Sequence, residues 1–256
     1  TAFTESGGGM AANASVAVAR LGGRVHYWGR VGDDPLGERI LGQLAAEGVD
    51  VSGARRVPGC ASPSAALLVA DDGERLVCAY NDPRLDTDPS WLPLGQVPAF
   101  AAVLADVRWP EGAGPVLDAA RTAGRAAVLD ADVAPPAVLV ELAPRATHAI
   151  FSAPGLALAA GTGDPGAGLA RLAENHPGVV GVTLGPDGFL WRQRGVEQPL
   201  AVRMGINTGF CNVGNFGSDD RMEYTIIGAE ANLAARLQSI AEPGGVVMSY
   251  ETYALV

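Results

Sequence analysis

Lysine is absent from this sequence: all 18 basic residues among the 256 are arginines. A Walker A phosphate loop needs a lysine, and so does a Schiff-base enzyme, so both classes are excluded. The formal net charge is −10. Proteins that bind nucleic acid usually present a basic surface to the phosphates. The sequence therefore predicts no nucleic-acid partner.

Cysteine and histidine are scarce and scattered. No CxxC pair and no histidine pair has the spacing of metal ligands, so we expect free buried thiols in a reducing cytoplasm and no metal site. No apolar run is long enough to span a bilayer and no signal peptide opens the sequence, so we expect a soluble, cytoplasmic protein without membrane contact. The cysteines are Cys60, Cys78 and Cys211, and the histidines are His26, His148 and His176.

Apolar strands alternate with helices along the first 200 residues, which predicts an α/β fold with a parallel sheet and helices on both faces. Small apolar residues predict a helix over 10–20, and a second helix follows Asp34, its expected N-cap. Two apolar runs around Asp71-Asp72-Gly73 predict an antiparallel hairpin over about 64–81, a possible lid. Ligands of such sheets lie at the carboxyl ends of the strands.

The first 200 residues resemble the ribokinase/PfkB family of ATP-dependent sugar kinases. Glycines let backbone N–H groups approach a hydroxylated ligand, and Asn13 can both donate to and accept from sugar hydroxyls. The resemblance implies a sugar or sugar-acid substrate held by Gly8, Gly9, Asn13 and Asp33. Arg108, at the expected carboxyl end of a strand, is either a further contact for an anionic group or an ordinary surface arginine. The residues that carry the first signature are Gly8, Gly9, Asn13, Gly29, Gly32, Asp33 and Gly37.

The segment "VTLGPDG", residues 182–188, matches the strand and glycine turn that border the ATP site of this family. The resemblance assigns Thr183, Gly185 and Gly188 to nucleotide binding, with ATP as phosphoryl donor and Mg²⁺ bridging its phosphates. The 64–81 hairpin corresponds to the family's β lid.

Two parts of the kinase pattern are missing from these 256 residues. The family's first strand, which carries an aspartate for the sugar, would precede residue 1. The "GAGD" motif, which supplies an anion hole and the catalytic base, occurs nowhere. The similar "GTGDPG" at 161–166 comes before the ATP-site strand and is therefore in the wrong topological position.

Residues 201–256 resemble the C-terminal part of class III adenylate/guanylate cyclase domains, an α+β, ferredoxin-like fold. Asn232 and Arg236 lie one helical turn apart in "ANLAAR" and can converge on one phosphate. The resemblance assigns these two to catalysis and Thr225 to reading the purine edge. Leu233, Leu237 and Ile240 are expected to form the buried stripe of this helix.

The two metal-binding aspartates of the cyclases belong to an N-terminal half that has no counterpart before residue 201. We therefore interpret the chain as a composite: a sugar kinase body over 1–200, joined to a partial cyclase domain over 201–256, both catalytically incomplete. An active class III adenylate cyclase and a non-enzymatic engineered or artificial fusion are the alternatives. Cyclases of this family work as dimers, so a homodimer is possible.

Overall fold

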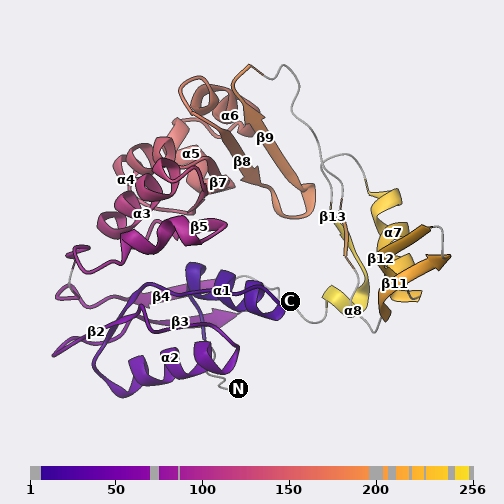
Figure 1. Ribbon diagram of the computed structural model, residues 1–256. Coiled ribbons are helices and arrows are strands. Elements are labelled where there is room, and N and C mark those ends of the chain that lie inside the picture. The colour runs from indigo at the N-terminus through magenta and orange to yellow at the C-terminus, as the bar shows by residue number, and fades with distance from the viewer. Residues whose placement is uncertain are drawn as a thin grey trace. The chain divides into compact units, whose positions relative to one another are not determined.

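The computed structural model describes residues 7–69, 75–85, 87–195, 204–206, 212–218, 221–227, 229–241 and 246–253 (Figure 1). Contacts divide the chain into two compact units, Thr1–Asp130 and Ala131–Val256. The predicted domain boundary at residue 200 lies outside the described residues and stays a prediction. Within the described ranges, no helix has both the length and the apolar character needed to cross a membrane.

The first unit alternates helices and short strands, and its last residue, Asp130, lies within strand β6. Its elements are α1 (Met10–Arg20), β1 (Arg30–Gly32), α2 (Pro35–Ala46), β2 (Arg55–Val57), β3 (Ser64–Val69), β4 (Arg75–Tyr80), the 3-10 helix η1 (Leu94–Ala99), β5 (Ala102–Asp106), α3 (Pro110–Thr122) and β6 (Ala126–Ala131).

The second unit continues the alternation and then changes to short strands around one helix. Its elements are α4 (Pro136–Leu142), η2 (Ala143–Arg145), β7 (His148–Ser152), α5 (Ala153–Ala160), α6 (Pro165–Ala173), β8 (Val179–Thr183), η3 (Gly185–Asp187), β9 (Phe189–Gln193), β10 (Met204–Ile206), β11 (Asn212–Ser218), β12 (Arg221–Ile227), α7 (Ala229–Ile240), β13 (Val246–Met248) and α8 (Tyr250–Tyr253).

A five-stranded sheet has the order β5-β6-β7-β8-β9, in which β5–β6 and β7–β8 pair in parallel and β9 runs antiparallel to β8. This arrangement confirms the predicted α/β fold with a mostly parallel sheet. β1 and β2 form a separate parallel pair. β3 and β4 form the predicted antiparallel hairpin, with Ser64 opposite Tyr80 and Val69 opposite Arg75. The tip of the hairpin lies outside the described residues.

Each unit has its own apolar core. In the first, α1 and α2 bury Ala12 and Leu44 against Val49, with Tyr27 packed beside them. In the second, side chains from successive helices and strands are almost fully buried. They are Leu139, Leu142, Phe151, Leu156, Leu169, Val180 and Val182.

Two burial expectations are wrong. Leu233 and Ile240 of α7 are 38% and 70% exposed instead of forming a buried stripe. Among the described residues, α7 contacts β10, β12 and β13, and these contacts leave Leu233 and Ile240 accessible to solvent. Cys78 is exposed, because it lies in a two-stranded sheet whose described side chains over 76–80 are all exposed. Cys60 is buried as expected, and Cys211 lies outside the described residues.

Candidate functional site

The start of α1 presents three of the predicted sugar-binding residues together. Gly9 precedes the helix with φ of 102°, a conformation that favours glycine, and Gly8 beside it is exposed. The carbonyl of Gly9 accepts the N–H of Asn13 at 2.8 Å. The Asn13 side chain is exposed and makes no hydrogen bond with the described residues, so its amide is available to a ligand.

Asp106 joins this helix start to the carboxyl end of β5. Its Oδ2 accepts the backbone N–H of Ala11 at 3.2 Å, and its Oδ1 accepts the backbone N–H of Arg108 at 2.9 Å. The structure thus brings the Gly9–Asn13 turn and Arg108 to the two sides of one carboxylate. The Arg108 side chain is exposed.

The turn between β1 and α2 gives its two adjacent aspartates different environments. Asp34 is the N-cap of α2, as predicted, and its Oδ1 accepts the N–H of Gly37 at 2.7 Å. Asp33 uses its backbone N–H to reach the carbonyl of Val57 at 3.0 Å, while its side chain is exposed. Asp33 is therefore the carboxylate available to a ligand, whereas Asp34 holds the turn.

Ser62 holds this turn through three hydrogen bonds. Its hydroxyl donates to Oδ1 of Asp34 at 2.6 Å and accepts the N–H of Gly32 at 2.9 Å, and its own N–H donates to Oδ2 of Asp34 at 2.9 Å. These bonds, led by the Ser62 hydroxyl, hold the pKa of Asp34 below its usual range. A Cβ on Gly32 would collide with the carbonyl of Cys60, so the close approach requires glycine there.

An aromatic and cationic cluster supports the loop that carries Arg108. The Arg30 guanidinium lies 4.2 Å from the ring centre of Trp109, which stacks on Trp91 at 5.5 Å. The Trp109 indole N–H donates to the carbonyl of Thr87 at 3.1 Å. Burial, with the charge of Asp106 as a smaller contribution, raises the pKa of Tyr27 behind this cluster, and Arg30 opposes the rise.

The predicted nucleotide residues share one turn of the second unit. Thr183 ends β8, Gly185 opens η3, and Gly188 precedes β9. Gly185 is exposed and has φ of 59°. Gly188 is buried, has φ of 91°, and its carbonyl accepts the N–H of Leu184 at 2.8 Å. Gly188 therefore shapes the turn. Gly185 is exposed to solvent, and the exposed Thr183 donates its hydroxyl to the carbonyl of Phe151 at 3.4 Å.

The "GTGDPG" segment connects two helices. Gly161 ends α5 in the left-handed conformation, and Asp164 caps α6 by accepting the N–H of Ala167 at 2.6 Å. These are the roles that glycine and aspartate normally have at helix ends. The structure therefore gives this segment a local structural role.

Two of the three predicted cyclase residues, Asn232 and Arg236, lie on α7 and are exposed. Asn232 and Arg236 are one turn apart on this helix, as their spacing requires. Thr225 lies on β12, where its backbone is opposite Gly214 of β11.

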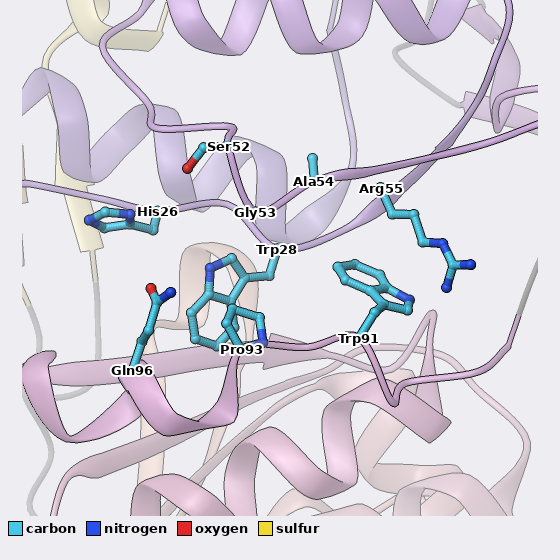
Figure 2. Close-up of a pocket in the computed structure, with 9 residues that line it drawn as sticks. All are labelled: His26, Trp28, Ser52, Gly53, Ala54, Arg55, Trp91, Pro93 and Gln96. Atoms are coloured by element: carbon cyan, nitrogen blue, oxygen red, sulfur yellow. The ribbon is translucent and has the colours of Figure 1, made fainter.

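A cavity of about 470 Å³ lies elsewhere in the first unit. Figure 2 shows the rings of Trp28 and Trp91 at its centre, with His26 and Gln96 towards one end and Arg55 towards the other. Its lining residues include none of the predicted sugar or nucleotide residues. Trp28 precedes β1 and Arg55 begins β2, so the cavity lies at the amino ends of these strands. We place the candidate site at their carboxyl ends, where parallel strands bind ligands.

Two residues of the candidate site were missed from the sequence. Asp106 ends an apolar strand, and a polar residue at that position is a signal that could have identified it. Ser62 had no such signal, because a serine 28 residues from Asp34 in a Pro-rich stretch is not distinctive. Within the part of the chain that the structure describes, no group of three histidine, cysteine or acidic residues could hold a metal ion.

The fold is that of an α/β protein with a mostly parallel sheet and a separate antiparallel β hairpin. The family model described as "pfkB family carbohydrate kinase" matches residues 1–204. The chain therefore belongs to the pfkB carbohydrate kinase family. The model described as "Adenylate and Guanylate cyclase catalytic domain" matches residues 187–256. The two matches overlap over residues 187–204.

Sequence relatives agree with the kinase family. Fructokinase-1 from Oryza sativa subsp. japonica is 38% identical over 85 residues, which are 33% of this chain and 26% of that protein. Fructokinase-2 from Solanum habrochaites is 37% identical over 84 residues, again 33% of this chain and 26% of that protein. The chain thus spans about a quarter of the length of the curated relatives that it matches.

Solved structures extend the similarity to most of the chain. A structure described as "a putative ribokinase" from Agrobacterium tumefaciens has a TM-score of 0.70 and 40% identity, and it covers 75% of this chain and 63% of that one. Fructokinase from Vibrio cholerae O395 has a TM-score of 0.62 and 25% identity, and it covers 75% and 71%. Another structure of that fructokinase contains fructose, ADP and a calcium ion.

Proposed function

We propose that this chain is the sugar-binding body of an ATP-dependent sugar kinase, which transfers the γ-phosphoryl group of ATP to a hydroxyl of a sugar. The observation that carries the proposal is the exposed Gly8-Gly9-Asn13 turn, tied through Asp106 to the carboxyl end of β5. Backbone N–H groups, an amide and an exposed carboxylate, Asp33, are the groups that hydroxyl-rich ligands need.

Nucleotide binding is assigned to the turn after β8. Thr183 donates its hydroxyl proton to the Phe151 carbonyl and leaves its oxygen as an acceptor, and Gly185 has an exposed backbone, so both fit the edge of a nucleotide. Gly188 contributes by holding the turn. Mg²⁺ usually binds through substrate phosphates and one or two carboxylates, so it would arrive with the triphosphate. When bound, it would neutralise charge on the transferring phosphoryl group.

Turnover is expected to be low for these 256 residues by themselves. Deprotonating the sugar hydroxyl needs a base beside an anion hole, and the sequence has no "GAGD" motif to supply it. Asp164 lies in the similar "GTGDPG" segment, but its carboxylate caps helix α6. Binding of a sugar without rapid phosphorylation is therefore the expected behaviour.

Binding and turnover can be separated in two measurements on the same preparation. Calorimetric titration with fructose and with ribose measures binding, and coupled detection of ADP in the presence of Mg²⁺ measures turnover. We expect one of the sugars to bind with little ADP formed. Failure of every tested sugar to bind would refute the proposal, and ordinary kinase rates would refute the expected lack of a base.

A cyclase activity is the second candidate, favoured by the family match over 187–256. Asn232 and Arg236 are exposed on one helix, where they could reach the phosphate and ribose of a nucleoside triphosphate. The test is formation of cyclic AMP or cyclic GMP with Mn²⁺ or Mg²⁺. A cyclase would lose activity in Arg236→Ala and keep it in Gln238→Ala, an exposed change on the same helix. Absence of any cyclic nucleotide would exclude this candidate.

The homodimer expected from the cyclase resemblance stays a prediction.

A further inference from the structure

We infer that Asp106 is a positioning residue of the sugar site and that its negative charge makes the site select neutral sugars over sugar acids. This inference rests on the proposed function. The carboxylate joins two segments that are distant in sequence: Oδ2 accepts the N–H of Ala11, 95 residues away, at 3.2 Å, and Oδ1 accepts the nearby N–H of Arg108 at 2.9 Å. Both segments carry candidate sugar-binding residues.

Helix α1 depends on this distant carboxylate at its amino end. Its N-cap is Gly9, which has no side chain, and its first turn contains no acidic residue. The first backbone N–H groups of a helix have no partner within the helix and together carry a partial positive charge. Helices α2 and α6 supply their own side-chain caps, Asp34 and Asp164. For α1 this role falls to Asp106.

Without Asp106, the α1 start would favour an anionic substrate. The amino end of a helix attracts carboxylates and phosphates, because its N–H groups and dipole both favour negative charge. Here the Asp106 carboxylate already accepts the N–H of Ala11, between Gly9 and Asn13. A second carboxylate at this end would meet a like charge. Neutral hydroxyls meet no such repulsion and can still bind the free amide of Asn13.

The negative charge of Asp106 also acts on a neighbouring titratable group, Tyr27. It contributes to the raised pKa of the buried Tyr27 hydroxyl, and Arg30 acts in the opposite sense. The Arg30 guanidinium is stacked on Trp109, one residue after Arg108. Asp106 is therefore one of several fixed charges around the turn, and removing its charge alone is expected to change anion affinity by roughly tenfold.

The test compares Asp106→Asn, which removes the charge but keeps an acceptor, with Asp106→Glu, which keeps the charge. Asp118→Asn, an exposed change on α3, is the control. Affinities for fructose, ribose and gluconate are measured by calorimetry on the full chain. We expect wild type, Asp106→Glu and the control to prefer a neutral sugar, and Asp106→Asn to shift the ratio roughly tenfold towards gluconate. Equal changes for all three ligands would overturn the selectivity.

Positioning is tested separately by amide hydrogen exchange, which needs no ligand. In Asp106→Ala, the N–H of Ala11 is expected to exchange faster, while amides in α2 keep their protection. Unchanged exchange at Ala11 would overturn the positioning role. If Asp106→Ala does not fold, the same comparison is made with Asp106→Asn. Should wild type bind no sugar while exchange at Ala11 responds, the proposed function fails and the positioning role stands.

Discussion

The buried hydroxyl of Ser62 donates a hydrogen bond to the carboxylate of Asp34 at 2.6 Å, across 28 residues of sequence. Ser62 is only 2% exposed, and its oxygen also accepts the N–H of Gly32. One side chain thus fixes the end of β1 and the start of α2. The exposed Asp33 lies between them, so its direction depends on this buried contact.

Replacing Ser62 with alanine is expected to lower the free energy of unfolding by about 1–3 kcal/mol, because the buried N–H of Gly32 loses its acceptor. Chemical denaturation measures the change. Ser90→Ala is the matched control: it removes the same kind of serine–aspartate bond, to Asp88 at 2.6 Å, at an exposed position. Equal effects of the two substitutions would contradict the structural role of Ser62.

The adjacent aspartates are expected to respond differently to neutralisation. Asp34→Asn should destabilise the protein by about 1–3 kcal/mol, because an amide can neither accept all three bonds nor carry the charge. Asp33→Asn should leave stability within about 0.5 kcal/mol and weaken sugar binding. Thermal unfolding and calorimetric titration of both variants check this. The reverse pattern would mean that Asp34 contacts the sugar.

Asp82 is expected to stabilise the folded protein above about pH 4 and to lose this contribution as the pH falls further. Its carboxylate accepts bonds from the Arg84 guanidinium at 2.7 Å and the Ala61 N–H at 2.8 Å, and these hold its pKa well below the usual range. A lowered folded-state pKa stabilises above the unfolded value, and the contribution is lost as pH falls towards the folded value.

Asp82→Asn should therefore have a lower Tm than wild type at pH 7, and the difference should shrink as the pH is lowered below about 4. Thermal melts at a series of pH values measure it. A difference in Tm that stays constant from pH 7 to pH 3 would show that the bonds of Asp82 do not depend on its charge.

Neighbouring residues of α4 provide a test of the second unit's core. Leu139 is fully buried, whereas Val140 is 54% exposed. Leu139→Ala should cost about 2–5 kcal/mol, because it removes buried methyl groups and leaves a cavity. Val140→Ala should change stability by less than about 0.5 kcal/mol. Similar losses at the two positions, measured by denaturation, would contradict this packing.

Local patterns in the sequence were sufficient for most elements. Asp34 and Pro35 mark the start of α2, and the hairpin signal between the 64–69 and 75–80 strands is confirmed. The apolar segment 153–160 was not predicted as a helix; the structure begins α5 there, with Ser152 as its cap. A continuous apolar run does not distinguish a buried helix from a strand by periodicity, so this region was ambiguous.

The candidate site was only partly predictable because its connections are long-range. Gly8, Gly9 and Asn13 could be identified from motif and local chemistry. The choice between Asp33 and Asp34 depends on Ser62, and the support of α1 depends on Asp106; neither partner is near in sequence. Exposure of Leu233 could not be predicted, because a helical pattern does not show which face of the helix its neighbours will cover.

The most direct test of a sugar site at the start of α1 is calorimetric titration of the intact chain, wild type and Asn13→Ala, with fructose and ribose. The account predicts that wild type binds one of these sugars and that Asn13→Ala binds it about tenfold more weakly with an unchanged Tm, because the exposed amide contacts the ligand and supports no fold contact. Identical affinities for the two proteins, or no binding by wild type, would contradict the account.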